Sequence, residues 1–295
     1  ALQSARGGDR ERADIRVLVG ERTHHEARGA LINRGRIGSA HRVQEETALL
    51  PLELRQVLRP DEIATFLREA TEILDEERGG RPFAGVKRDA IIPFFERGQF
   101  LAQLPADDRI YGIAESLLGP DFFLVATEGN LHVGDTLWHG GAGNPDVLPH
   151  VKIAFYLEPL TPATGCLRII PGSHRPEFGG LLKEVQKSGD PDRLLFGVPQ
   201  SDLPCVALES EPGDLVVFTE DVHHASFGGR PGRQQHGISF MANPSTEDEV
   251  AFLRDLYSRM KYSCHPPESY INSDNARLRR MVEPLVELGF EALPV

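Results

Sequence analysis

The hydrophobic period of the sequence changes at Gly119, and this change constrains the fold more than any other feature. Before it, apolar residues recur at helical spacing over 60–80 and 107–119, and both segments end at glycine. After it come six short runs rich in β-branched and aromatic residues, separated by glycine- and proline-containing turns: FFLVAT, VKIAFYL, CLRIIPG, CVALES, DLVVFT and GISFMA. Helices followed by many short strands predict an antiparallel sandwich or barrel rather than a doubly wound sheet.

The length of 295 residues suits one large domain with additions. Residues 1–48 are rich in Arg, Gly and Glu and have no sustained apolar period, so we expect a mobile or lid-like arm. Residues 49–295 form the predicted domain, in which helical spacing returns over 247–295 as a C-terminal tail. The predicted class is therefore mainly β with flanking α, and the helices pack outside.

Composition and missing motifs exclude several classes of function. A net charge of −12 argues against a groove for polymeric nucleic acid and favours a small-molecule partner. No run approaches the roughly 18 apolar residues of a membrane span, and no secretory signal is visible, so we expect a cytoplasmic protein. The three cysteines are scattered and form no C-x-x-C pair, and no glycine-rich nucleotide-cofactor motif follows a strand.

Histidines stand at two points where strands of such a barrel would end. His139 lies in TLWHGG, and the pair His223 and His224 lies in DLVVFTEDVHHASFGG. Two neutral imidazoles on an inward-facing wall are typical of a non-haem iron site. Side chains alternate along a strand, so only one histidine of the adjacent pair can face the metal. Arg233, on the following strand, is a suitable bidentate clamp for a carboxylate.

From about residue 49 to residue 244 the sequence resembles the phytanoyl-CoA dioxygenase branch of the iron(II)/2-oxoglutarate oxygenases. The resemblance rests on WHGG, VKIAFYLEPLTPATGCLRIIPGSHRP, EPGDLVVF and HASFGG. It implies a double-stranded β-helix, which is a cupin-like jelly roll, and it implies iron(II), 2-oxoglutarate and dioxygen as cofactors. The family's H-x-S spacing falls on His224 and Ser226. The resemblance thus implies His139 and His224 as iron ligands, with Arg233 and Ser226 holding the distal carboxylate of 2-oxoglutarate.

The sequence departs from the family two residues after its first histidine, where the family has an aspartate and this chain has Gly141. Three explanations compete: an inactive ligand-binding jelly roll, a hydroxylase whose carboxylate comes from elsewhere, such as Asp146, and a halogenase in which chloride takes the vacated position. Related halogenases have glycine or alanine there. The retained histidines, Ser226 and Arg233 weigh against an inactive site. We therefore expect a halogenase in which Gly141 marks the halide position.

The substrate is suggested only by resemblance. The sequence resembles free-standing halogenases rather than those that need a carrier protein, and specifically the type that chlorinates nucleotides in antibiotic biosynthesis, which implies a deoxyadenosine phosphate. Lys87, Arg88 and Lys152 are candidate contacts for the phosphate. Lys152 shares a strand face with Ala154 and Tyr156 and is predicted to point inward. For Lys87 and Arg88 the sequence favours a solvated surface over a substrate contact.

Overall fold

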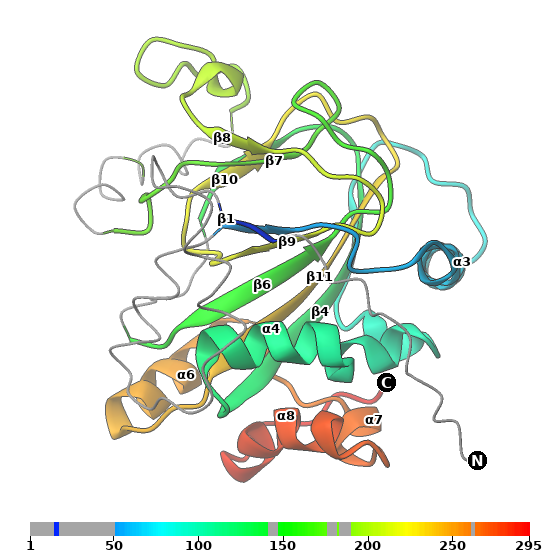
Figure 1. The fold of residues 1–295 in the computed structure, drawn as a ribbon, viewed down its shortest axis with the longest axis vertical. Helices are drawn as coiled ribbons and strands as arrows, with labels where there is room; N and C mark the ends of the chain where they lie inside the picture. The colour runs from blue at the N-terminus through cyan, green and yellow to red at the C-terminus, as the bar shows by residue number, and fades with distance from the viewer. Residues whose placement is uncertain (1–14, 18–50, 141–146, 176–181, 183–189, 261–262) are drawn as a thin grey trace, which may run out of the picture.

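The computed structural model describes residues 15–17, 51–140, 147–175, 182, 190–260 and 263–295 (Figure 1). Its strands form a seven-stranded sheet in the order β1-β2-β9-β6-β11-β4-β3 and a four-stranded sheet in the order β5-β10-β7-β8. All strand pairs within these two sheets are antiparallel. The strands are β1 (Ile15–Val17), β2 (Leu52–Leu54), β3 (Asp89–Ile91), β4 (Phe122–His132), β5 (Thr136–His139), β6 (His150–Phe155), β7 (Leu167–Ile169), β8 (Val206–Leu208), β9 (Leu215–Phe218), β10 (His224–Ser226) and β11 (Arg233–Ala242).

The described helices lie outside the sheets, and Figure 1 shows α4 beneath the larger sheet with α7 and α8 beyond it. The two helices predicted before Gly119 are confirmed as α3 and α4. The α-helices are α3 (Pro60–Glu77), α4 (Asp108–Leu118), α6 (Glu247–Arg259), α7 (Glu268–Ile271) and α8 (Ala276–Glu287). Short 3-10 helices are η1 (Phe95–Arg97), η2 (Leu101–Ala106) and η3 (Gln200–Asp202). The predicted mainly-β jelly roll with external helices is therefore confirmed.

Local chemistry explains where the first helix begins. Pro60 occupies its first turn, where a missing N–H costs no hydrogen bond, and Asp61 and Glu62 place negative charge at the positive end of the helix. The Glu62 side chain also accepts a hydrogen bond from the backbone N–H of Arg59 at 2.8 Å. The apolar stripe of α3, which includes Phe66, is buried. This stripe anchors the helix against the sheet.

The larger sheet separates the helices from the interior of the jelly roll. Along β6, Val151, Ile153 and Phe155 belong to the core shared with the helices. The intervening residues, Lys152 and Ala154, face the opposite side and line a pocket. Because side chains alternate on a strand, one sheet supplies both the helix-packing face and the polar wall of the pocket.

The structure adds a short strand near the N-terminus and defines the helices of the C-terminal tail. Ile15–Val17 pairs with β2 at the sheet edge, although we expected no element of the sheet in residues 1–48. The rest of this arm lies outside the described residues, so its lid-like role stays a prediction. The helical tail comprises α6, α7 and α8, and α8 buries Leu278 and Met281. Among the described residues, no helix has the length and apolar character needed to cross a membrane.

Candidate active site

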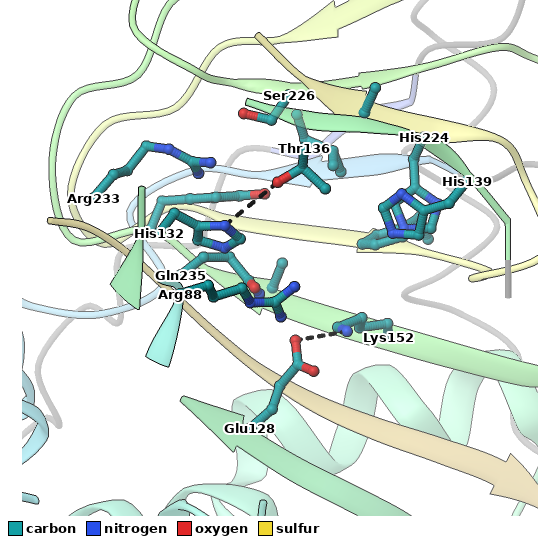
Figure 2. Close-up of a pocket in the computed structure, with 15 residues that line it drawn as sticks. Arg88, Glu128, His132, Thr136, His139, Lys152, His224, Ser226, Arg233 and Gln235 are labelled. Carbon is teal, nitrogen blue, oxygen red and sulfur yellow. Dashed lines mark hydrogen bonds and ion pairs between the residues drawn. The ribbon is translucent and has the colours of Figure 1, made fainter. Parts of the chain in front are cut away.

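A pocket lies between the two sheets, and Figure 2 shows two histidines at one end of it and Arg233 at the other. Its volume is about 490 Å³, a figure that includes space open to solvent. Strands of both sheets contribute to the wall. The lining residues are Arg88, Glu128, His132, Thr136, His139, Lys152, Ala154, Tyr156, Leu167, Phe218, His224, Ala225, Ser226, Arg233 and Gln235.

His139 and His224 are direct cross-strand partners on β5 and β10. Their ring centroids are 4.1 Å apart. The Nδ1 atom of His139 lies 2.8 Å from the carbonyl oxygen of Leu137, and that of His224 lies 2.8 Å from the carbonyl oxygen of Val222. A carbonyl only accepts hydrogen bonds, so each Nδ1 carries the proton and each Nε2 keeps a lone pair. This is the tautomer in which histidine binds a metal through Nε2.

Both rings are also held in the neutral form that a metal ligand requires. Burial lowers the pKa of His224 to about 3. Burial lowers the pKa of His139 as well, although this side chain lies at the exposed mouth of the pocket. The adjacent His223 does not line the pocket, and its backbone N–H donates to Ser173 Oγ at 2.7 Å. The structure thus brings together His139 and His224, the two histidines that we expected to bind iron.

The third protein ligand of a typical iron site has no counterpart in the described part of the chain. Within those residues, no group of three or more histidine, cysteine, aspartate or glutamate side chains could hold a metal. Gly141 and Asp146 lie outside the described residues, so the predicted halide position at Gly141 stays a prediction.

Arg233 is a buried cation without a protein acceptor for two of its nitrogens. The residue is 2% exposed. Neither Nε nor Nη2 has a hydrogen-bond partner among the described residues. Burial lowers the pKa of the guanidinium, which nevertheless stays charged at neutral pH because its ordinary value is so high. A buried fork of unsatisfied donors facing a pocket matches the geometry of a carboxylate.

Two glycines make room for this guanidinium. A Cβ added to Gly165 would lie 2.9 Å from Arg233 Nε, and one added to Gly229 would lie 2.8 Å from the same atom. Gly165 also has a φ of +94°, which a side chain would strain. The hydroxyl of Ser226, which is predicted to help hold 2-oxoglutarate, donates to the carbonyl oxygen of Gly165 at 2.9 Å. This hydrogen bond keeps the hydroxyl beside Arg233.

Several pocket residues were not predicted to belong to the site. His132, which no motif or partner spacing in the sequence marks, lines the pocket, and its Nδ1 lies 3.4 Å from Thr136 Oγ1. Burial, assisted by the positive charges of Arg233 and Arg88, lowers the pKa of His132 to about 3. Period-two spacing from Arg233 to Gln235 is the signal that could have identified Gln235 as a second inward-facing residue.

The three candidate phosphate contacts lie in different environments. Lys152 points into the pocket, where its Nζ lies 2.7 Å from Glu128 and 2.9 Å from Glu220. Burial opposes its charge, but the two carboxylates more than offset this effect and raise its pKa. Lys87 is exposed and is not among the lining residues, whereas Arg88 lines the pocket.

Comparison with known proteins places the chain among related sequences. A family model described as Phytanoyl-CoA dioxygenase (PhyH) matches residues 52–233. Over 199 residues the chain is 27% identical to an ectoine dioxygenase of Nocardia farcinica (strain IFM 10152), which covers 61% of this chain. The aligned region spans 62% of that relative's length.

Similar folds occur in solved structures. One is HygX from Streptomyces hygroscopicus with nickel and 2-oxoglutarate bound, with a TM-score of 0.51, 19% identity and coverage of 73% of this chain and 94% of that chain. Another is EctD from S. alaskensis in its apoform, with a TM-score of 0.51, 20% identity and coverage of 81% and 85%. At 19% and 20% identity, the similarity to these two structures concerns the fold alone.

Proposed function

The chain belongs to the phytanoyl-CoA dioxygenase family, and on that premise we propose that it is an iron(II)/2-oxoglutarate-dependent oxidoreductase acting on a small molecule. One observation carries the proposal. His139 and His224, whose Nδ1 atoms are bonded to carbonyl oxygens so that Nε2 keeps its lone pair, line the same pocket as Arg233, whose Nε and Nη2 have no acceptor among the described residues. This combination suits a metal at one end and the far carboxylate of a dicarboxylate at the other.

The residues of this chain have separable tasks in such a reaction. His139 and His224 would hold the iron, and their backbone acceptors fix both ring orientations. Arg233 would hold the distal carboxylate of 2-oxoglutarate and so orient its keto-acid end toward the iron, and Ser226 would join it by turning its single hydroxyl hydrogen from the Gly165 carbonyl to the carboxylate. With dioxygen, the bound iron and 2-oxoglutarate supply an oxidant able to remove hydrogen from an unactivated C–H bond. The pocket wall then fixes which substrate carbon lies nearest.

We further propose that the reaction is halogenation, with chloride as a co-substrate. The support is the replacement of the family's aspartate by Gly141, together with two histidines and no third metal donor among the described residues. Glycine removes both the charge and the bulk that would exclude a halide. The proposed substrate is a free-standing (deoxy)adenosine nucleotide of natural-product biosynthesis, with no carrier protein.

Hydroxylation is the second candidate function. It is favoured by the 27% identity to an ectoine dioxygenase, since dioxygenases of this kind transfer oxygen rather than halide. In that case a carboxylate such as Asp146 would complete the metal site. A ligand-binding jelly roll without catalysis is the third possibility, and it predicts no iron uptake and no succinate formation.

The decisive experiment loads the protein with iron(II) under anaerobic conditions and adds 2-oxoglutarate, dioxygen and a panel of adenine nucleosides and nucleotides. Each reaction is run with and without chloride and read by mass spectrometry. A chlorine isotope pattern on one product is the expected result. A hydroxylated product formed equally with and without chloride would contradict halogenation, and the absence of succinate would contradict the oxidoreductase itself.

A pair of substitutions at position 141 tests the halide position. Gly141→Asp restores the family's carboxylate and is expected to abolish chlorination, because the carboxylate takes the position proposed for chloride. Gly141→Ala is the matched control, since alanine adds one methyl group but no ligand atom. We expect the alanine variant to keep chlorinating activity. Chlorination by the aspartate variant at the wild-type rate would show that position 141 does not border the halide.

A further inference from the structure

We propose that Arg88 binds an anionic oxygen group, a phosphate or a carboxylate, on the primary substrate. This inference rests on the proposed function, because it assumes that Arg233 is engaged by 2-oxoglutarate. It deepens that function by stating the chemical class of substrate that the pocket selects.

Arg88 is oriented by neutral partners. Its Nε and Nη2 donate to Asn130 Oδ1 at 3.1 and 2.5 Å. Asn130 is buried, and its Nδ2 donates to Gln235 Oε1 at 3.0 Å. Gln235 Nε2 in turn donates to the carbonyl oxygen of His236 at 2.9 Å. This chain of amides fixes the direction of the guanidinium without neutralising its charge.

Of the other two pocket cations, one has a counter-charge in the protein and the other is assigned one by the proposed function. Lys152 lies between Glu128 and Glu220. Arg233 would be neutralised by the distal carboxylate of 2-oxoglutarate. Among the residues that the structure describes, Arg88 forms no ion pair with a carboxylate, so it is the one pocket cation whose charge is left for the substrate.

The charge of the pocket is opposite to the charge of the whole chain. Three cationic side chains and one carboxylate, Glu128, line it, and Glu220 pairs with Lys152 from outside the lining, so these groups leave one excess positive charge before 2-oxoglutarate binds Arg233. His132 adds none at neutral pH, because burial lowers its pKa to about 3. The protein as a whole carries −12. A positive pocket in an acidic protein concentrates anions where the surrounding surface repels them.

The position of Arg88 also suits contact with a substrate rather than with the metal. Figure 2 shows its guanidinium on the wall formed by Gln235 and Lys152, away from Ser226 and the other residues proposed for 2-oxoglutarate. Its side chain combines pocket contact with solvent exposure, so an entering molecule meets it near the opening. The neighbouring Lys87 does not line the pocket, which separates two residues that the sequence presents as equivalent.

The test measures binding without requiring catalysis. The full chain is loaded with nickel, as a redox-inert metal, and with saturating 2-oxoglutarate. The probes are deoxyadenosine, deoxyadenosine monophosphate, inorganic phosphate and acetate, and binding is followed by calorimetry and thermal shift. We expect at least one anionic probe to bind the wild type, and Arg88→Gln to weaken its binding about tenfold or more, as loss of a charged hydrogen bond predicts. Arg68→Gln, which removes an exposed positive charge on α3, is the matched control.

The outcomes separate this inference from the proposed function. Equal binding of every anionic probe to the wild type and Arg88→Gln, or no binding of any anionic probe to the wild type, would overturn the role of Arg88. Affinity for 2-oxoglutarate is expected to be the same in the wild type and Arg88→Gln. If 2-oxoglutarate fails to bind the wild type, the proposed function fails instead. A loss of 2-oxoglutarate affinity in Arg88→Gln would assign this arginine to the co-substrate and also overturn the inference.

Discussion

Replacing Arg233 with methionine separates what the guanidinium costs the fold from what it contributes to the pocket. Arg233 is 2% exposed, and its Nε and Nη2 have no acceptor among the described residues. An unsatisfied buried polar group of this kind costs about 1–3 kcal/mol. Methionine keeps much of the apolar stem and removes the charge, so we expect the free energy of unfolding without 2-oxoglutarate to rise by about 1–3 kcal/mol.

Binding of 2-oxoglutarate should raise the free energy of unfolding of the wild type but not that of Arg233→Met. At one hundred times its dissociation constant, 2-oxoglutarate stabilises a protein that binds it by about 2.7 kcal/mol. We expect the nickel-loaded wild type to gain this stabilisation and Arg233→Met to gain none. Urea denaturation with and without 2-oxoglutarate measures both effects. The same stabilisation by 2-oxoglutarate in both proteins would refute the role of Arg233, and a large loss of stability without it would refute the energetic argument.

Arg230 provides a control three residues away. Its side chain is 64% exposed and pairs with Glu158 at 2.8 Å. Exposed ion pairs contribute little, so Arg230→Met is expected to change the free energy of unfolding by less than about 1 kcal/mol. It should leave the stabilisation by 2-oxoglutarate intact.

Three further predictions follow from the packing around the pocket. Gly165→Ala should weaken 2-oxoglutarate binding about tenfold, because its Cβ would lie 2.9 Å from Arg233 Nε. In calorimetry, an equal loss in Gly172→Ala, which shares a positive φ but meets no atom within 4 Å, would contradict this reason. Lys152→Met should lower the free energy of unfolding, measured with denaturant, by about 3–5 kcal/mol, because it leaves Glu128 and Glu220 without their counter-charge. Lys152→Arg keeps the charge and should lower the free energy of unfolding less. Burial lowers the pKa of His236 to about 3, so its neutral form is favoured in the folded state. Stability should therefore fall by about 1.4 kcal/mol per pH unit from this residue as pH drops from 6.5 toward 3, and His236→Phe should remove that slope.

Some elements of the fold could be predicted from local sequence and others could not. The helices over Pro60–Glu77 and Asp108–Leu118 were predictable because their apolar spacing and their end signals agree. The choice of His224 over His223 followed from alternation along one strand and from the family's spacing. By contrast, Ile15–Val17 was missed as a strand, because a three-residue edge strand depends on its partner β2 rather than on its own composition.

The same holds for the pocket, where some residues could not be identified from local sequence. Lys87 and Arg88 are neighbours with the same charge, and no local pattern distinguishes them. Arg88 lines the pocket because Asn130 and Gln235, from two other strands, hold its guanidinium there. His132 is likewise a pocket residue that no spacing along the chain identifies, and the charges of Arg233 and Arg88 act on it only because the fold brings them near.

The sequence by itself predicted the class of fold from periodicity, and its resemblance to the family pointed to His139, His224, Ser226 and Arg233 as site residues, because periodicity and motif spacing are properties of neighbouring residues. It also determined that Gly141 stands in place of the family's aspartate. Only the tertiary structure decided that the Nδ1 atoms of both histidines bond to carbonyl oxygens, that Nε and Nη2 of Arg233 lack an acceptor among the described residues and that Lys152 is already paired. The physical reason is that hydrogen-bond and charge balance depend on residues brought together by strand pairing from distant parts of the chain.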